Sequence, residues 1–478
     1  MDYTKLSLLE VADLLRTKKV TSVELTKQCL ENIKNNKSLN ALNLVCEEYA
    51  LNQAKKVDEL RLSGKELPLL AGIPITIKDN INISGLTTTC SSRFLENFVA
   101  PYNATIIEKL LDQMVVIVGK NNLDEFAMGS STENSAFGPA LNPHNTQYVS
   151  GGSSGGSACA VAANLCYASI GTDTGGSVRQ PASLCGCVGL KPTYGLVSRY
   201  GIVAFASSLD QAGPLTKTVK DSAAMLNAIC GYDKREETSN KNHPKVDYLK
   251  SFTGSVKGIK IGIVKEFFGD GIDPQVKESV LKAAEFYKQQ GAELIELSMP
   301  NAKNALACYY VLSSAEAASN LARFDGVKYG VACDVSNLNE LYLKNRSHGF
   351  GKEVKRRIML GNYVLSSGYY DAYYKKAKAV QKLIVNEFKK VFETCDVILS
   401  PTSPTPAFKI GEKVNDTLSM YLSDIYTVPV NIAELPAISV PCGFSSKGLP
   451  IGMQLIGAKF SEPTLFNVAD VFFSREAK

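Results

Sequence analysis

GGSSGGSA at residues 151–158 and DTGGSVRQPA at 173–182 are the two turns on which the fold of this chain depends. Taken alone, the first turn has the glycine–serine composition of a flexible linker. Its surroundings argue against a linker, because small apolar residues at 158–165 predict a buried helix and 167–170 predicts a buried strand. Both turns are therefore expected to be fixed loops between core elements.

Strands and helices alternate outward from these turns. GIPITIKDN at 72–80 lies in a β-branched stretch bounded by glycine and proline, which predicts a strand within Leu70–Asn80. The apolar run Val115–Val118 is typical of a strand buried on both faces. Helices are expected from an Asn103 cap to Met114 and over about Tyr369–Glu393. This alternation predicts the α/β class.

The length of 478 residues allows about three domains, although a large α/β enzyme can form one body. We expect a single domain over 1–478. Its parts are an N-terminal helical segment (1–65), a core (66–230), a polar surface linker (231–250) and the remaining sheet with the substrate-pocket helices (251–478).

Composition excludes several classes of protein. A net charge of +5, from 52 basic and 47 acidic residues, does not by itself indicate a nucleic-acid surface. No apolar run approaches the ~18 residues of a transmembrane helix, and the start of the chain lacks the apolar core of a signal peptide. The chain is therefore expected in the cytoplasm or an equivalent organelle interior. The 12 cysteines form no C-x-x-C pair, so no metal site is expected.

The chain has only three histidines, so acyl-transfer chemistry would need another base. Lys78 ends the predicted strand in apolar surroundings, where burial can lower the pKa of lysine from ~10.4 to roughly 7–8. Ser177 follows two glycines that permit a tight turn. Ser153 is expected to hydrogen-bond to both Lys78 and Ser177 and so to pass a proton between them.

An oxyanion would then lie against the backbone N–H groups of the second turn. The candidate donors are those of Thr174, Gly175 and Gly176.

Two other interpretations of the first turn are weaker. Gly151–Gly155 matches the G-x-S-x-G nucleophile elbow of α/β-hydrolases, but the preceding residues 142–149 are polar and contain Pro143. A phosphate-binding loop is also conceivable, but the Gly-Lys-Ser/Thr sequence of a P-loop is absent.

Together with GIPITIKDN, the two turns resemble the amidase signature family. That resemblance implies one large mixed, twisted β-sheet sandwiched between α-helices. By residue match, Lys78 is the family's catalytic lysine, Ser153 its relay serine and Ser177 the serine that forms the acyl-enzyme.

Further stretches resemble those members of the family that supply ammonia to a tRNA-dependent amidotransferase. They are NNLDEFAMGSSTENS (121–135), GLKPTYGLVSRYGIVAFASSLDQAGP (189–214), NLARFDGVKYG (320–330), GFGKEVKRRIMLGNYVLSSGYYDAYYKKA (349–377) and DIYTVPVNIAELPAISVPCG (424–443). The resemblance implies a glutaminase in a heterotrimer with subunits B and C. Its ammonia would convert Glu-tRNA(Gln) to Gln-tRNA(Gln) on a partner that uses Mg-ATP, and this chain would need no cofactor itself.

The same resemblance implies a pocket for the two charged ends of glutamine. Arg357 would pair with the α-carboxylate and Asp424 with the α-amino group, while Tyr309 would line the pocket. Arg356 is adjacent to Arg357 and stays open as the carboxylate ligand. Two alternatives remain, a stand-alone amidase acting on a small or aryl amide and a catalytically silent scaffold subunit.

Overall fold

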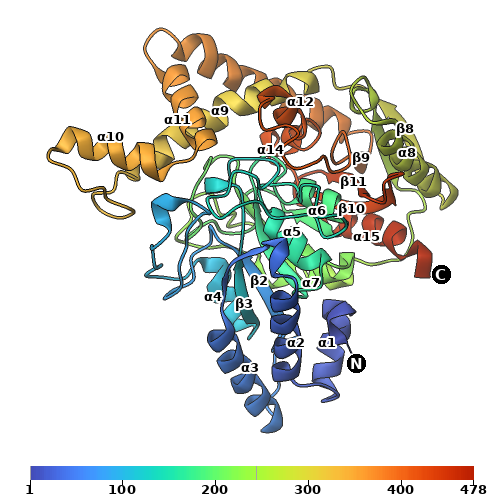
Figure 1. Cartoon of the computed structure of the whole chain (residues 1–478). Helices are drawn as coiled ribbons and strands as arrows, with labels where there is room; N and C mark the ends of the chain where they lie inside the picture. Colours follow the sequence, from blue (N-terminus) through green and yellow to red (C-terminus); the bar gives the residue numbers. More distant parts are fainter. Residues whose placement is uncertain (1, 244, 478) are drawn as a thin grey trace.

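Eleven strands form one mixed sheet in the computed structural model, which describes residues 2–243 and 245–477 (Figure 1). The strand order is β1-β3-β2-β4-β6-β5-β10-β11-β9-β7-β8. Strand β2 runs parallel to β3 and β4, and β7 runs parallel to β8 and β9, whereas the remaining pairs are antiparallel. The mixed α/β sheet expected from the family resemblance is thus confirmed.

The strands are short, and most of those at the centre of the sheet are wholly buried. Their bounds are β1 (Leu42–Val45), β2 (Pro74–Lys78), β3 (Val116–Asn121), β4 (Ala168–Asp173), β5 (Val188–Lys191), β6 (Gln211–Thr216), β7 (Lys260–Val264), β8 (Glu293–Leu297), β9 (Val397–Pro401), β10 (Ala437–Phe444) and β11 (Pro450–Gly457).

Strands β2, β3 and β4 place the polar residues of the site. Every residue of the three strands is buried, as expected for parallel strands with both faces covered. Their last residues are Lys78, Asn121 and Asp173. Because parallel strands end at the same edge of a sheet, where α/β proteins bind ligands, these polar ends lie near one another.

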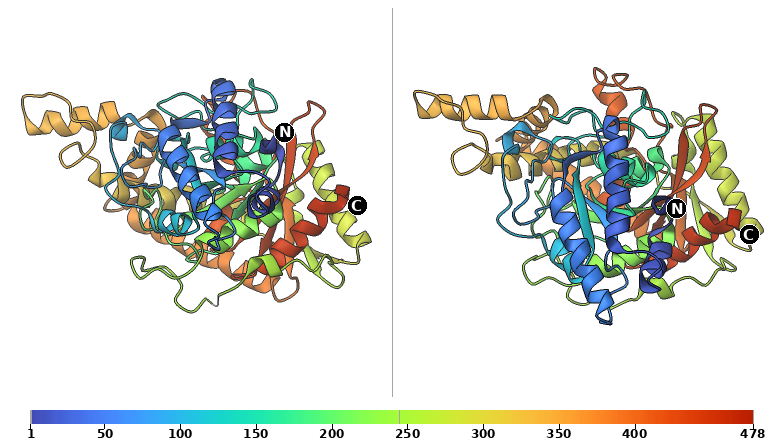
Figure 2. Two further views of the ribbon diagram at one scale, coloured as in Figure 1. Left: turned by 90° about the horizontal axis from the view of Figure 1, so that it is seen from below. Right: turned by 60° about the horizontal axis from the view of Figure 1, so that its bottom comes forward.

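Helices cover both faces of the sheet (Figures 1 and 2). They are α1 (Leu8–Arg16), α2 (Ser22–Asn35), α3 (Glu47–Leu62), α4 (Thr105–Asp112), α5 (Gly155–Ala162), α6 (Arg179–Cys185), α7 (Val219–Ile229), α8 (Pro274–Gln289), α9 (Ala305–Asn320), α10 (Leu338–Gly349), α11 (Lys352–Leu365), α12 (Lys376–Val391), α13 (Thr417–Leu422), α14 (Val428–Ile432) and α15 (Glu462–Phe473).

Three apolar clusters join these helices to the sheet. One contains the buried residues of α1, α7, α8 and α15, and a second contains those of α5 and α6. The third lies among α9, α11, α12 and α14. Since this third cluster supports α11, it also fixes the helix that carries Arg357.

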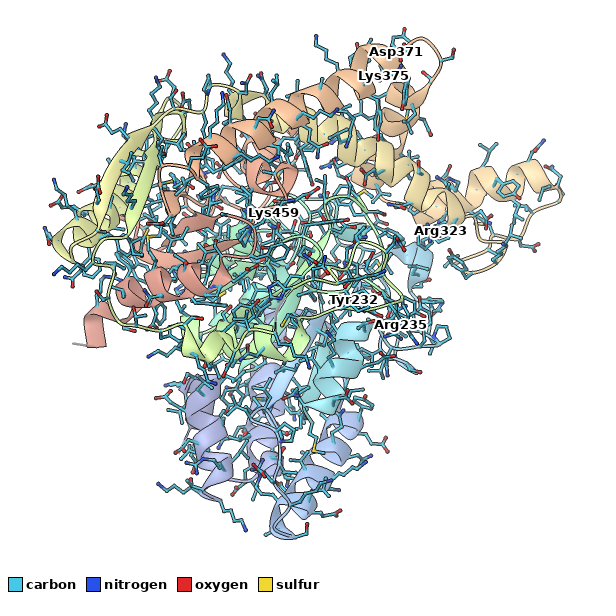
Figure 3. All side chains as sticks on the ribbon, turned by 180° about the vertical axis from the view of Figure 1, so that it is seen from behind. Tyr232, Arg235, Arg323, Asp371, Lys375 and Lys459 are labelled. Atoms are coloured by element: carbon cyan, nitrogen blue, oxygen red, sulfur yellow. The ribbon has the colours of Figure 1, made fainter. Side chains whose placement is uncertain are left out.

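Two helical parts extend beyond the body of the protein. Helix α10 projects away from it in both views of Figure 2. The turn between α11 and α12 forms the other projection, and Asp371 and Lys375 mark its tip in Figure 3, where they form an ion pair of 2.7 Å. No helix in the described residues has both the length and the apolar character needed to span a membrane.

Some elements differ from the sequence-based expectation. Ala104, rather than Asn103, is the N-cap of α4, because the Asn103 side chain instead accepts a hydrogen bond from the Ser84 amide at 2.7 Å. The helix expected over Tyr369–Glu393 begins with a π-helical turn, Tyr370–Lys375, before α12.

The polar segment at 231–250 is tied to the body through Asp233, whose buried carboxylate accepts hydrogen bonds from Ser198 Oγ at 2.8 Å and from Thr105 Oγ1. Pro244 of this segment lies outside the described residues.

The packing of α11 on α9 predicts the effect of filling Gly361. A Cβ added there would lie 2.0 Å from the Ser314 carbonyl oxygen of α9. We expect Gly361→Ala to lower the free energy of unfolding by about 1–3 kcal/mol in urea titrations. In an open helix the same change would stabilise by about 1 kcal/mol, so a stabilised variant would contradict this packing. Asn362→Ala, at the exposed neighbouring position, serves as the control.

Candidate active site

The Lys78 side chain is buried at the end of β2 and surrounded by neutral oxygens. Its Nζ lies 2.7 Å from Ser153 Oγ, 2.8 Å from Ser154 Oγ and 2.9 Å from Thr172 Oγ1, so the neutral amine can donate to two of these oxygens and accept from one hydroxyl. Burial lowers the pKa of Lys78 to about 7, although the more distant charges of Asp124 and Asp173 oppose the shift. At neutral pH a large fraction of this amine is therefore unprotonated and able to act as a base.

The loop that carries Ser153 is held from both sides. The Gly152 amide donates to Gln180 Oε1 at 3.0 Å, and the Asp124 amide donates to the Ser153 carbonyl at 3.2 Å. A Cβ on Gly152 would lie 2.1 Å from Asp124 Oδ2, so only glycine fits there without movement. The peptide bond between Gly152 and Ser153 is cis.

Ser177 lies in the turn between β4 and α6. Its exposed fraction is 8%, whereas Ser153 and Lys78 are each 0% exposed. Ser177 is thus the member of the set that a substrate can reach. Ser153 and Ser177 both lie within the residues that the structure describes, and no hydrogen bond joins their hydroxyl groups there. Only the Lys78–Ser153 half of the expected relay is therefore already formed.

Asp173 shapes the nucleophile turn. Its carboxylate accepts the amides of Gly176 at 2.9 Å and Val178 at 3.1 Å, and it receives Arg179 Nε and Nη2 at 3.1 and 3.0 Å. Burial alone would raise the pKa of Asp173, but the buried Arg179 guanidinium holds it well below its usual range. The turn is consequently built around a permanent carboxylate.

This arrangement affects the oxyanion donors expected from the sequence. Because the Gly176 amide already donates to Asp173, it can bind an oxyanion only by sharing or releasing that bond. The other two expected donors, Thr174 and Gly175, are fixed through different atoms. Thr174 Oγ1 donates to Asp210 Oδ1 at 2.7 Å, and the Gly175 carbonyl accepts Thr427 Oγ1 at 2.7 Å.

Tyr309 packs directly against the same turn. A Cβ on Gly175 would lie 2.7 Å from Tyr309 Cζ, which places the ring beside the residues that precede Ser177. Tyr309 therefore lies beside the turn that carries Ser177, whereas the lining of the cavity at Arg357 does not include it.

Arg357 lies on α11 beside the stacked rings of Tyr310 and Tyr421, whose centroids are 3.7 Å apart. Its Cζ lies 4.5 Å from the Tyr310 ring centroid and 4.9 Å from that of Tyr421. Its Nε donates to Glu353 Oε1 at 2.6 Å. Its Nη1 is buried without a partner in the described residues. Since buried polar groups are nearly always hydrogen-bonded, this donor is available to bind an acceptor group of a ligand.

The side chain of Arg356 is placed differently. It is 38% exposed and pairs with Glu353, whereas the Arg357 side chain is 3% exposed. Of the two adjacent arginines, the structure therefore favours Arg357 as the one that recognises a buried anion.

Asp424 offers the opposite charge. It follows the end of α13, and its Oδ2 accepts Ser130 Oγ at 2.5 Å. Its Oδ1 is buried without a partner in the described part of the chain. Burial raises the pKa of Asp424 to about 7, and the charge of Arg357 opposes that shift. A cavity of about 70 Å³ is lined by Ser130, Tyr421 and both Arg356 and Arg357. Asp424 is not part of its lining and adjoins it through Ser130. One free cationic donor and one free anionic acceptor suit a zwitterionic amino acid.

Several supporting residues were missed by the sequence reasoning. Ser154 and Thr172 hold Lys78, Asp173 and Arg179 hold the nucleophile turn, and Glu353 holds Arg357. The Asp173–Arg179 pair had a visible signal, because both charges stand inside DTGGSVR, a stretch otherwise free of charge. Thr172 and Glu353 gave no signal, since only the fold brings them to the site.

Comparison with known proteins agrees with this geometry. The Amidase family model matches residues 24–466. The A subunit of the Glutamyl-tRNA(Gln) amidotransferase of Caldanaerobacter subterraneus subsp. tengcongensis is 58% identical over 474 residues, which cover 99% of this chain and 96% of the relative. The resemblance to the amidase signature family seen in the sequence is thereby confirmed.

Solved structures share the fold over nearly the whole chain. The crystal structure of the A subunit of a Glutamyl-tRNA(Gln) amidotransferase from Thermotoga maritima is 42% identical, with a TM-score of 0.83 and coverage of 99% of this chain and 96% of that one. A peptide amidase from Stenotrophomonas maltophilia is 28% identical, with a TM-score of 0.84 and coverage of 99% and 97%.

The neutral state of Lys78 predicts the pH dependence of amide hydrolysis. A base acts only when unprotonated, so kcat/KM is expected to fall about tenfold per pH unit on the acid side of a midpoint near pH 7. In Asp424→Asn, kcat should still decline on the acid side of pH 7. This result would assign the pH dependence to Lys78 rather than to the Asp424 carboxyl. A profile that rises only near the ordinary pKa of lysine would contradict the assignment.

Proposed function

This chain belongs to the amidase family, and from that membership we propose that it is the glutamine-hydrolysing component of a tRNA-dependent amidotransferase. The observation that carries the proposal is the pair of unpartnered buried atoms, Arg357 Nη1 and Asp424 Oδ1. A simple amide offers nothing to either charge, whereas glutamine offers an α-carboxylate and an α-ammonium group. The relatives named as A subunits of amidotransferases support the same function.

The proposed chemistry uses the Lys78–Ser153 hydrogen bond, which is already formed, and requires Ser177 Oγ to come within hydrogen-bonding distance of Ser153 Oγ. Neutral Lys78 accepts a proton from Ser153 as Ser153 accepts one from Ser177, and Ser177 Oγ then attacks the carboxamide carbon. The resulting oxyanion is bound by the amides of Thr174 and Gly175, joined by that of Gly176 if it leaves Asp173.

The intermediate then collapses in two steps. The proton held by Lys78 returns through Ser153 to the leaving nitrogen. Ammonia departs, and the glutamyl ester of Ser177 remains. Water attacks that ester with its proton taken by the same relay, which releases glutamate and restores the Ser177 hydroxyl.

Ammonia is the product that a partner would use. We propose that subunits B and C complete a heterotrimer in the cytoplasm, where Glu-tRNA(Gln) is activated with Mg-ATP and converted to Gln-tRNA(Gln). The relatives are named as subunits, which supports an assembly. The hydrolytic step balances with the side chains of this chain alone, so no cofactor is proposed for it.

A stand-alone amidase is the second candidate, because the peptide amidase of Stenotrophomonas maltophilia has the same fold. That function would leave Arg357 and Asp424 buried without a role. A silent scaffold would likewise leave the Lys78–Ser153 hydrogen bond without a purpose.

Loss of the nucleophile should abolish turnover without affecting the fold. We expect Ser177→Ala to lower glutaminase kcat by at least about 10³-fold, with an unchanged melting temperature and unchanged binding to the partner subunits. Ser446→Ala, at an exposed position, is the matched control. Wild-type-like glutamine turnover by Ser177→Ala would rule out the acyl-enzyme mechanism.

The two adjacent arginines should differ sharply in glutamine recognition. A hydrogen bond to a charged group contributes about 1.5–3 kcal/mol, so Arg357→Ala should raise the glutamine KM roughly 10- to 150-fold. Arg356→Ala should change it less than about threefold, because an exposed ion pair contributes little. Steady-state ammonia release measures both, and equal effects of the two substitutions would count against Arg357 as the carboxylate ligand.

A further inference from the structure

Two consecutive acidic residues, Asp124 and Glu125, lie between the loop that carries Ser153, here called the relay loop, and helix α11, which carries Arg357. We infer that Glu125 is a positioning residue that sets the place of Arg357 by fixing the start of α11, while Asp124 fixes the loop of Ser153. This inference rests on the proposed glutaminase function and assigns a role to the acidic pair inside NNLDEFAMG.

Glu125 contacts α11 at its N-cap residue. The Gly351 amide, at the N-cap of α11, donates to Glu125 Oε2 at 2.8 Å. A Cβ on Gly351 would lie 2.4 Å from the same oxygen. Burial raises the pKa of the Glu125 carboxyl to about 7, and the hydrogen bonds from Ser92 and the Gly351 amide oppose that shift.

A second contact ties down the chain just before α11. Ser92 Oγ donates to Glu125 Oε1 and also lies 3.2 Å from the Gly349 carbonyl. The ring of Phe350 stacks on Phe94 with centroids 4.7 Å apart. The three residues before α11 are therefore held by one carboxylate, one hydroxyl and one aromatic ring.

Arg357 is close enough to this anchor to follow any movement of it. It lies six positions after Gly351, which is about 9 Å of helix. Between them Glu353 accepts both Arg357 Nε at 2.6 Å and Tyr421 Oη at 2.8 Å. A shift at the start of α11 is thus passed along a short rigid segment to the guanidinium.

Asp124 serves the other half of the site. Its carboxylate accepts the amides of Thr132 at 2.9 Å and Asn134 at 3.2 Å, and it abuts Gly152. Immediately after the acidic pair, Phe126 and Ala127 adopt left-handed conformations with φ of 50° and 62°. Asp124 itself is extended, with φ of −62° and ψ of 138°, and in extended backbone successive side chains point to opposite sides, so the neighbouring carboxylates reach two separate parts of the site.

The test compares three variants of the full chain in complex with its partner subunits. Glu125→Ala should raise the glutamine KM about tenfold with kcat within twofold. Glu125→Gln keeps an acceptor for the Gly351 amide and should restore KM to within about threefold of wild type. Asp124→Asn should instead lower kcat at least about tenfold, with KM nearly unchanged.

Hydrogen–deuterium exchange at residues 351–358 provides a readout that needs no substrate. Glu125→Ala should speed exchange there, and Glu125→Gln should not. Faster exchange with an unchanged KM would overturn the link to Arg357, and unchanged exchange would overturn the anchoring itself. A wild-type complex that fails to hydrolyse glutamine would instead refute the proposed function, while exchange still tests the anchor. If Glu125→Ala fails to fold, Gly351→Ala displaces the same contact and is expected to give the same KM effect.

Discussion

The buried amine of Lys78 is the constraint on which the rest of the site depends. An ammonium ion in such surroundings is costly unless it is paired, and the nearest oxygens of Lys78 are those of hydroxyls and a carbonyl. Burial therefore favours the neutral form and lowers the pKa to about 7. The covered β2 strand and the closely packed relay loop both serve to keep this amine away from water.

The charged residues around this amine are of two kinds, those whose atoms are all hydrogen-bonded and those that keep an atom without a partner. The Asp173–Arg179 pair is fully satisfied by its partners and shapes the turn that presents Ser177. Arg357 and Asp424, in contrast, each keep one buried atom free. The charges of the fully hydrogen-bonded pair thus shape the turn, and the atoms without a partner remain available to a ligand. Burying those atoms without a partner destabilises the fold when no ligand is bound. By the inference above, Asp124 and Glu125 link the loop that carries Ser153 to the start of α11 within two residues of sequence.

The sequence predicted the α/β class, strand β2 and the two glycine–serine turns because these depend on local patterns of apolar and small residues. It did not predict the short strand β1 or the π-helical turn at Tyr370–Lys375, which depend on neighbours distant in sequence. In the site, the side chains of Lys78 and Ser153 meet as the motif suggested. The choice between Arg356 and Arg357 needed burial, and the engagement of the Gly176 amide by Asp173 needed the folded turn.

A direct titration of Lys78 tests the central claim. Lysine labelled with ¹³C at Cε can be followed by NMR in the full chain, with Lys78→Met identifying the signal. We predict a transition near pH 7, caused by burial among neutral acceptors. A Lys78 signal that stays protonated until about pH 10, the ordinary range for lysine, would contradict the neutral-base mechanism.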